Sequence, residues 1–453
     1  MATILGANTL STGYTIENSV RFADGDNDAF SRTFGSALGT RTKFTISMWI
    51  KRGTMGHSQF LFEGTDGTYP THTYISSGNK FALYDGGENA TYVTTYELFL
   101  DPNAWYHVVT RIDTTQADNA NRVRFYINGV LQSTAQTNSI TQSGNISLGK
   151  QVAHYIGRRA SGTDSFDGYM AEVVYIESSS LGPDSFAEAD DNGVWIPKDV
   201  SGLSFPTNSA YLDFEDSSNL GNDAAGGTDW SEDNIVAINQ TVDSPTNNFA
   251  TINILVPGTT PLTFSKGNLK AAAGGGWGHC VGSIGLNSGK WYWEVDEITA
   301  NANAFFGICS ETAAINMDND ATPYDQNGLI LYFVDGRRTV DGTNSEGEYN
   351  AWGTTHGFAL DLDSGTRTLT FYKDGSSEGS VNLSTTHFPT DEFCFPTYLG
   401  SASSNATNVE FNFGNPVTAL ASGNADANGY GSFEFAPPNG HYAICTKNLA
   451  QYG

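Results

Sequence analysis

The chain is poor in basic residues. Its 453 residues include 22 Lys and Arg against 49 Asp and Glu, so the formal net charge at pH 7 is −27. A surface this acidic repels nucleic-acid backbones and anionic membranes, which argues against both as partners. The sequence also has no run of about 18 apolar residues, so we expect no membrane-spanning helix and no membrane insertion.

Cysteine is scarce as well. The four cysteines are Cys280, Cys309, Cys394 and Cys445, so the N-terminal half can hold no disulfide and no CxxC metal site occurs. Buried free thiols are the expected state, and a disulfide is the alternative. No HExxH or P-loop motif is present. The N-terminus lacks the basic and apolar regions of a secretory signal, so export by the usual route is not expected.

Glycine and aromatic residues are abundant instead. There are 50 glycines, and aromatic residues make up 12% of the chain. This composition suits short strands joined by turns. In FTISMWIKRG (residues 44–53) the apolar residues alternate, as expected for a strand with one buried face. RVRFYINGVLQ and RTLTFYKDGSSEG each place an Asn-Gly or Asp-Gly pair between strands, which predicts two type I′ hairpins at Asn128-Gly129 and Asp374-Gly375.

The repeated hairpin predicts an all-β chain with two tandem antiparallel β-sandwiches. We expect the first sandwich in residues 1–200, an ordered connector in residues 201–250, the second sandwich in residues 251–415 and a short closing segment in residues 416–453. The best helix candidate is LGPDSFAEADDNGVWIPKD, residues 181–199, because Pro183 suits a first turn and Gly193 a helix end.

Two stretches resemble known domain families. FTISMWIKRG, WYHVVTRID, FYINGVLQ, YIGRR and FDGYMAEVVYI, in this order, resemble the concanavalin A-like or laminin G-like jelly roll over about residues 18–180. GKWYWEVDEI, FFGIC, HGFALDLDSGTRTLTFYKDG and FPTYLG resemble a SPRY domain over about residues 260–415. The SPRY resemblance implies a binding module without enzymatic activity.

The whole chain also resembles tail-fibre-like virion structural proteins of bacteriophages, marine ones in particular. The matching stretches are YLDFEDSSNLGNDAAGGTDW, VDSPTNNFATIN, GKWYWEV and FAPPNGHYAICTKNL. This resemblance implies a protein of the virion surface, assembled in the host cytoplasm with other virion proteins. We expect a homo-oligomer, for which a trimer is one arrangement, although no heptad or collagen-like repeat indicates it.

The resemblance implies a tail-fibre or adhesin-type protein that binds a host-surface glycan or protein receptor through its sandwich loops. A capsid decoration protein, a head-fibre protein or another structural virion protein is the alternative, and a polysaccharide depolymerase is the least favoured hypothesis. We expect no enzymatic activity. In EVDE, residues 294–297, a glucanase-type strand would need a further carboxylate where Ile298 or Thr299 stands, so Glu294 is expected to be structural and not catalytic.

Candidate ligand-binding residues are Tyr69, His72 and Tyr74 in GTDGTYPTHTY, together with Trp352. Sugar sites combine aromatic faces with hydrogen-bonding groups, although such residues more often pack in cores or rims. Asp24, Asp26 and Asp28 alternate and could hold Ca²⁺ through their carboxylates. They lack the glycine and bidentate glutamate of an EF-hand loop, and a solvated turn is the alternative. Asp318-Asn319-Asp320 is a weaker case of the same kind.

Overall fold

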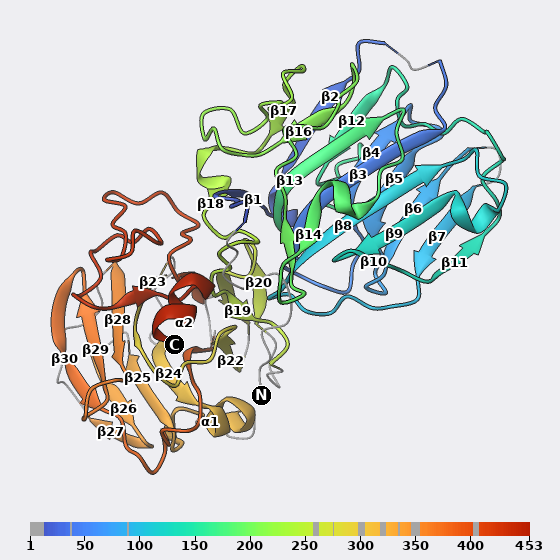
Figure 1. Cartoon of the computed structure of the whole chain (residues 1–453). Coiled ribbons are helices and arrows are strands. Elements are labelled where there is room, and N and C mark those ends of the chain that lie inside the picture. Colours follow the sequence, from blue (N-terminus) through green and yellow to red (C-terminus); the bar gives the residue numbers. More distant parts are fainter. Residues whose placement is uncertain are drawn as a thin grey trace. The chain divides into compact units, whose positions relative to one another are not determined.

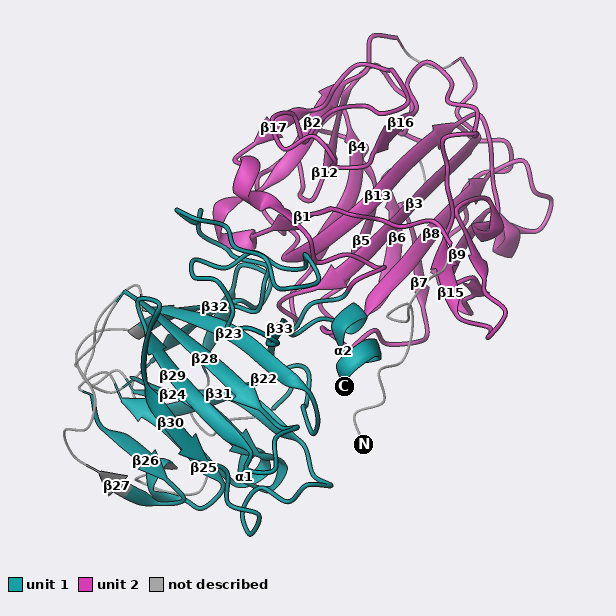
Figure 2. Cartoon of the chain, turned by 60° about the vertical axis from the view of Figure 1, so that its left-hand side comes forward, with its two compact units in different colours: residues 1–3, 248–453 teal, residues 4–247 magenta. Residues whose placement is uncertain are grey.

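The structure is a computed structural model that describes residues 13–36, 39–87, 90–256, 262–274, 276–297, 304–317, 323–333, 336–345, 354–401 and 407–453. The chain divides between Asn247 and Asn248 into two compact units, which we call the N-terminal unit and the C-terminal unit (Figure 2). In both, nearly all of the regular secondary structure consists of antiparallel strands, so the predicted all-β fold class is confirmed (Figure 1).

The N-terminal unit contains two large sheets and a two-stranded one. Sheet I has the order β10-β9-β8-β3-β13-β1-β18, with β16 paired to β13, and sheet II has the order β11-β7-β6-β5-β4-β12-β2-β17. The strands of sheet I are β1 (Ser19–Phe22), β3 (Lys43–Arg52), β8 (Trp105–Asp113), β9 (Val123–Ile127), β10 (Val130–Leu131), β13 (Gly168–Glu177), β16 (Ala210–Leu212) and β18 (Gln240–Thr241). The strands of sheet II are β2 (Ala29–Thr33), β4 (Gln59–Thr65), β5 (Thr71–Ile75), β6 (Phe81–Asp85), β7 (Thr91–Thr95), β11 (Thr134–Thr137), β12 (Ala153–Ile156) and β17 (Ser231–Asp233).

The core of this unit lies between the two sheets. As the alternation in β3 predicts, Phe44, Ile46, Met48 and Ile50 all belong to it. Trp49, on the opposite face of β3, is also buried, against a second apolar cluster that includes Ala187. Strand β3 is therefore covered on both faces.

Residues 181–199 do not form the predicted helix. They contain a single 3₁₀ turn (Pro183–Ser185) followed by a hairpin of β14 (Ala187–Ala189) and β15 (Trp195–Pro197). The turn between these strands has Gly193 at φ +81°, and the Asp190 carboxylate accepts hydrogen bonds from the N–H groups of Asn192 and Val194. This local bonding satisfies the backbone in a turn, which is why the Asp- and Gly-rich stretch does not continue as a helix.

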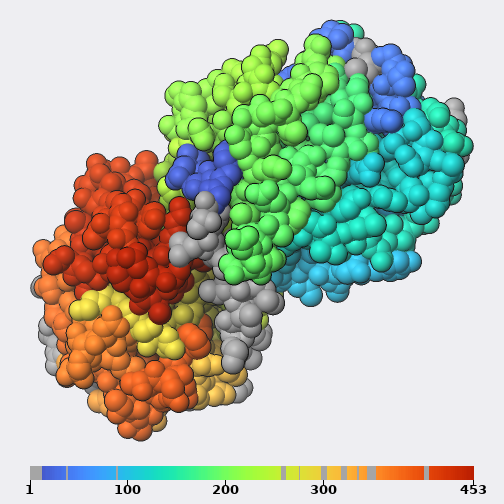
Figure 3. Space-filling view, in the orientation of Figure 1, coloured from blue at the N-terminus to red at the C-terminus, as the bar shows by residue number. Residues whose placement is uncertain are grey.

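The segment expected to connect the sandwiches supplies strands to the first one. Strand β16 pairs with β13, β17 with β2, and β18 with β1. Phe214, Trp230 and Ile235 are buried in the core between sheets I and II. Residues 201–247 are thus part of the N-terminal unit, and Figure 3 shows these yellow-green residues packed on its surface.

Both predicted hairpin turns have the backbone that type I′ requires. Asn128 and Gly129 have φ values of +47° and +78°, between β9 and β10. Asp374 and Gly375 have φ values of +46° and +77° in the corresponding turn of the C-terminal unit. The sequence pair that specifies this turn is therefore used in both sandwiches.

The C-terminal unit also contains two sheets. Sheet III has the order β19-β22-β31-β24-β25-β26-β27, and sheet IV the order β20-β21-β32-β23-β28-β29-β30 with β33 paired to β23. The strands of sheet III are β19 (Ile252–Asn253), β22 (Trp277–Gly282), β24 (Ala304–Ser310), β25 (Leu329–Phe333), β26 (Arg338–Val340), β27 (Thr343–Ser345) and β31 (Cys394–Ser401). The strands of sheet IV are β20 (Thr263–Ser265), β21 (Lys270–Ala273), β23 (Lys290–Glu297), β28 (Thr355–Asp361), β29 (Thr368–Lys373), β30 (Ser376–Asn382), β32 (Thr407–Asn412) and β33 (Tyr442–Ala443).

Two short helices complete this unit, α1 (Glu311–Asn316) and α2 (Thr446–Tyr452). Residues 416–453 pack against sheet IV, because β33 pairs with β23 and Phe433 is buried beside Tyr292. Among the described residues no helix is long and apolar enough to cross a membrane. The four cysteines are buried and have free thiols.

Candidate functional site

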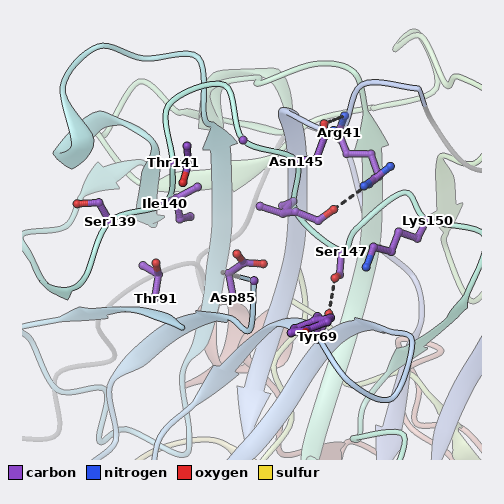
Figure 4. Close-up of a pocket in the computed structure, with 13 residues that line it drawn as sticks. Arg41, Tyr69, Asp85, Thr91, Ser139, Ile140, Thr141, Asn145, Ser147 and Lys150 are labelled. Atoms are coloured by element: carbon purple, nitrogen blue, oxygen red, sulfur yellow. Dashed lines mark hydrogen bonds between the residues drawn. The ribbon is translucent and has the colours of Figure 1, made fainter. Parts of the chain in front are cut away.

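A pocket of about 590 Å³ opens at one end of the N-terminal unit, where strands of sheet II begin and end (Figure 4). It lies beside the end of β6, the start of β7 and the loop that precedes β5. Its described lining residues are Arg41, Tyr69, Asp85, Gly87, Thr91, Ser139, Ile140, Thr141, Gly144, Asn145, Ile146, Ser147 and Lys150. We call it the rim pocket.

The floor of the rim pocket is a polar end of the sandwich core. Leu83 in β6 and Val93 in β7 point into the core. Because side chains two residues apart on a strand share a face, Asp85 and Thr91 point the same way. Strand β6 ends at Asp85 and β7 begins at Thr91. Beyond these two residues the core side of the sheet is bordered by loops with hydroxyl and amide side chains instead of apolar ones.

Asp85 is the carboxylate of this floor. Its Oδ1 accepts a hydrogen bond of 2.6 Å from Thr71 Oγ1, which itself accepts one of 2.9 Å from the Ser147 backbone N–H. Ser147 Oγ in turn donates to the Tyr69 carbonyl. Burial raises the pKa of Asp85, while the hydrogen bonds from Thr71 and the Gly87 N–H oppose the increase. The chain of bonds fixes the loops around the carboxylate.

An ion pair positions the tyrosine at the entrance. Lys150 Nζ lies 2.7 Å from Asp66 Oδ2, and Asp66 Oδ1 accepts hydrogen bonds from the N–H groups of Thr68 and Tyr69. The bonds from Lys150 and Tyr69 lower the pKa of Asp66 to about 2. This loop holds the Tyr69 side chain 51% exposed beside the pocket. On the opposite wall Arg41 Nε donates to the Ile146 carbonyl over 2.9 Å.

The rim pocket therefore offers an exposed ring, several hydroxyl groups, an amide, a buried carboxylate and two cations. None of its described lining residues is a histidine or a cysteine. A concave site with few apolar groups and many hydrogen-bonding groups is suited to binding a polar small molecule.

The predicted ligand-binding residues separate into two places. Tyr69 lines the rim pocket, whereas His72 and Tyr74 point to the outer face of sheet II, on the side away from the core. There they contact Phe60, with ring-centroid distances of 4.5 Å from His72 and 5.2 Å from Tyr74. Trp352 lies outside the described residues.

Sequence reasoning missed two more rings on this outer face. Strand pairing places His72 opposite Tyr84, and Tyr84 opposite Tyr92, on adjacent strands. The alternation in β6 and β7 could have shown that Tyr84 and Tyr92 share a face. Their register against β5 could not be obtained, because nothing in the sequence aligns the three strands.

The structure does not bring Asp24, Asp26 and Asp28 together as a metal site. Asp28 is buried, and its Oδ2 accepts hydrogen bonds from the Ala23 N–H and from Asn239 Nδ2. Asp24 instead lies 3.6 Å from His57 Nε2 at the surface. Within the described part of the chain, no group of three His, Cys, Asp or Glu side chains is arranged to hold a metal ion. Asp318-Asn319-Asp320 falls outside that part.

A serine and a histidine do meet in the N-terminal unit, but not as a catalytic pair. His107 Nε2 lies 2.9 Å from Ser47 Oγ, and the Trp195 indole N–H donates to His107 Nδ1 over 3.0 Å. Because Nδ1 accepts this bond, the neutral ring carries its proton on Nε2 and donates to Ser47. Burial lowers the pKa of His107 to about 3. The ring cannot remove the hydroxyl proton in this arrangement.

Glu294 is buried in the C-terminal unit and accepts four hydrogen bonds. Oε1 accepts them from Tyr292 Oη at 3.0 Å and the Phe435 N–H at 2.8 Å. Oε2 accepts them from the Glu434 N–H at 2.8 Å and Asn412 Nδ2 at 3.3 Å. Burial raises the pKa of Glu294 to about 7, against the opposing effect of these bonds. The carboxylate fastens the closing segment to β23.

Part of the N-terminal unit matches a known family model. Residues 24–183 match the model of the concanavalin A-like lectin/glucanases superfamily. No curated protein matches the chain. Similar solved structures include a heptameric SAP-like pentraxin from Limulus polyphemus, at 15% identity over 37% of this chain and 80% of that one, with a TM-score of 0.28. A protein described as carbohydrate binding from Bacteroides ovatus has 20% identity over 48% of this chain and 58% of that one, with a TM-score of 0.34.

The SPRY domain of human HERC1 is also similar, at 19% identity over 32% of this chain and 87% of that one, with a TM-score of 0.25. Structures with a SPRY domain are thus among the similar solved structures. Residues 24–183 have a lectin-like fold of a kind compatible with glycan or protein binding.

Proposed function

We propose that the chain is a carbohydrate-binding protein and that the rim pocket of the N-terminal unit takes a sugar. The observation that carries this proposal is the combination of the exposed Tyr69 ring with the Asp85 carboxylate, at the end of a lectin-like sandwich. A ring can stack on the apolar face of a sugar, while the carboxylate and the surrounding hydroxyl groups accept and donate hydrogen bonds.

Replacing Tyr69 by Ala is expected to weaken sugar binding by about tenfold or more, because exposed anchoring rings of binding sites contribute more than 1 kcal/mol. The measurement is binding of wild type and variant to a glycan array, followed by calorimetric titration with the best-bound sugar. Tyr96→Ala is the matched control, since Tyr96 is also an exposed tyrosine, at 60%, and lies at the opposite end of β7. Equal loss in both variants, or no binding to any array glycan, would contradict the proposal.

We also propose that the protein binds without catalysis. Glu294 is occupied by four donors, and Ser47–His107 has the wrong proton arrangement for a nucleophile and base. Incubation of the purified protein with polysaccharides is therefore expected to release no reducing ends. The proposal would be contradicted if the wild type released reducing ends and the Glu294→Gln variant, while still folded, did not. Glu294 would then be a catalytic residue and not a structural one.

The proposal of where the protein acts rests on the sequence resemblance to phage virion proteins. We propose that the chain is displayed on the virion surface as a tail-fibre or adhesin-type protein, together with other virion proteins, and binds a host-surface glycan or receptor. A capsid decoration role is the alternative. Immunogold labelling of purified particles distinguishes tail from capsid, and absence of label from both would refute the virion assignment.

A further inference from the structure

We propose that the outer face of sheet II is a second sugar-binding surface, on which a carbohydrate chain held in the rim pocket continues across β5, β6 and β7. This inference rests on the proposed function of the rim pocket and deepens it, because it names the ligand as a polysaccharide and not as a single terminal sugar. The residues that carry it are His72, Tyr74, Tyr84 and Tyr92, which we call the tyrosine row.

The tyrosine row follows from strand register. Glu63 in β4 pairs with His72 in β5, His72 pairs with Tyr84 in β6, and Tyr84 pairs with Tyr92 in β7. Directly paired residues place their side chains on the same face, one strand spacing of about 4.8 Å apart. The ring centroids reflect this spacing, at 5.1 Å between His72 and Tyr84 and 4.5 Å between Tyr84 and Tyr92.

The rings are arranged from a buried end to an exposed end. His72 is 5% exposed, Tyr74 and Tyr84 are half-buried, and Tyr92 is 45% exposed. The buried His72 lies between Tyr74 and Tyr84, at 5.3 Å and 5.1 Å, so packing holds these rings in place. A surface of rings fixed before binding loses little side-chain entropy when a ligand stacks on it.

Charged groups border the same surface. Glu63 Oε1 lies 3.5 Å from His72 Nδ1, and its Oε2 accepts a hydrogen bond of 2.6 Å from the Ala160 N–H. The Arg159 guanidinium lies over the Phe60 ring at 5.1 Å and is partly exposed. Glu63 is buried, so it holds His72 and the Ala160 loop in place, and the partly exposed guanidinium and the tyrosine hydroxyl groups are the polar groups that a sugar chain would meet beside the apolar ring faces.

The tyrosine row also adjoins the rim pocket. Tyr84 directly precedes Asp85 in β6, and Tyr92 directly follows Thr91 in β7, so each strand contributes one residue to each surface. Tyr69 lines the pocket and lies three residues before His72. Because successive residues of a strand point to opposite faces, the rim pocket and the tyrosine row lie on opposite sides of the ends of β6 and β7, and a ligand longer than the pocket reaches the row by passing around these strand ends.

The test compares chain lengths. Calorimetric titrations use the disaccharide and the octasaccharide of cello-, laminari-, xylo- and chito-oligosaccharides. For a series that binds, wild type is expected to bind the octasaccharide about tenfold or more tighter than the disaccharide, as expected when further anchoring rings are engaged. The double variant Tyr84→Ala/Tyr92→Ala should lose this gain and keep disaccharide affinity, whereas Tyr84→Phe/Tyr92→Phe and Tyr96→Ala should keep the gain.

A second measurement does not depend on substitution. Tetranitromethane should nitrate Tyr92 in the free protein, and the octasaccharide but not the disaccharide should protect it, as read by peptide mass spectrometry. The inference is overturned if length brings no gain, if the double Ala variant keeps the gain, or if Tyr92 stays unprotected. Disaccharide binding that persists in those cases leaves the rim pocket intact as the sugar site. Absence of binding by all eight sugars overturns the proposed function together with the inference.

Discussion

Glu294→Ala should destabilise the C-terminal unit by about 3–5 kcal/mol, because each buried donor left without an acceptor costs about 1–3 kcal/mol. The donors concerned are Tyr292 Oη, Asn412 Nδ2 and the backbone N–H groups of Glu434 and Phe435. Chemical denaturation followed by tryptophan fluorescence measures the loss. Asp391→Ala, at an exposed carboxylate of the same unit, is the control and should change stability by no more than about 0.5 kcal/mol.

The same carboxylate gives this prediction a pH dependence. Burial raises the pKa of Glu294 in the folded state to about 7, from an ordinary value of 4.5. A raised folded pKa means that the folded state binds the proton more tightly, so this contribution to stability is complete below pH 4.5 and is lost as pH rises through about 7. Wild type should therefore lose stability over this window relative to Glu294→Gln. A stability difference between the two that is constant with pH would contradict the assignment.

Gly129→Val should destabilise the N-terminal unit by about 2–4 kcal/mol, through backbone strain and a steric clash. Gly129 has φ +78°, which a β-branched residue adopts only with strain, and a Cβ there would lie 2.7 Å from the Trp195 ring. Displacement of Trp195 would also remove its hydrogen bond to His107. Differential scanning calorimetry of the purified protein gives the shift in unfolding temperature.

Ser133→Val is the control for this prediction. Ser133 is exposed in the short segment between β10 and β11, and a substitution there should change stability by no more than about 0.5 kcal/mol. If Gly129→Val and Ser133→Val unfold at the same temperature, Gly129 does not need the left-handed backbone that the type I′ turn assigns to it.

Features that depend on neighbouring residues could be read from the sequence. The alternation of Phe44, Ile46, Met48 and Ile50 specifies one face of a strand, and Asn128-Gly129 specifies a turn, because each needs only local chemistry. The prediction of a helix in residues 181–199 was wrong because the local pattern there fits more than one structure. Its proline and glycine suit both a helix and a turn followed by a hairpin, and the hairpin is favoured by the Asp190 turn together with the burial of Ala187 against sheet I.

The candidate site depended on contacts between distant residues. Tyr69 could be chosen from its loop, but Asp85 and Lys150 come from other parts of the chain and reach it only through sheet pairing and loop packing. His72 and Tyr74 were selected for the same loop, yet strand alternation places them on the outer face. No pattern in one sequence gives the register that aligns His72 with Tyr84 and Tyr92.

The buried thiols have a consequence for the environments in which the protein remains intact. Burial raises the pKa of the Cys280, Cys309 and Cys394 thiols, so at neutral pH they carry almost none of the thiolate that reacts with oxidants or disulfides. The N-terminal unit contains no sulfur except in methionine. Passage from a reducing cell interior to an oxidising medium should therefore change none of the covalent bonds on which either sandwich depends.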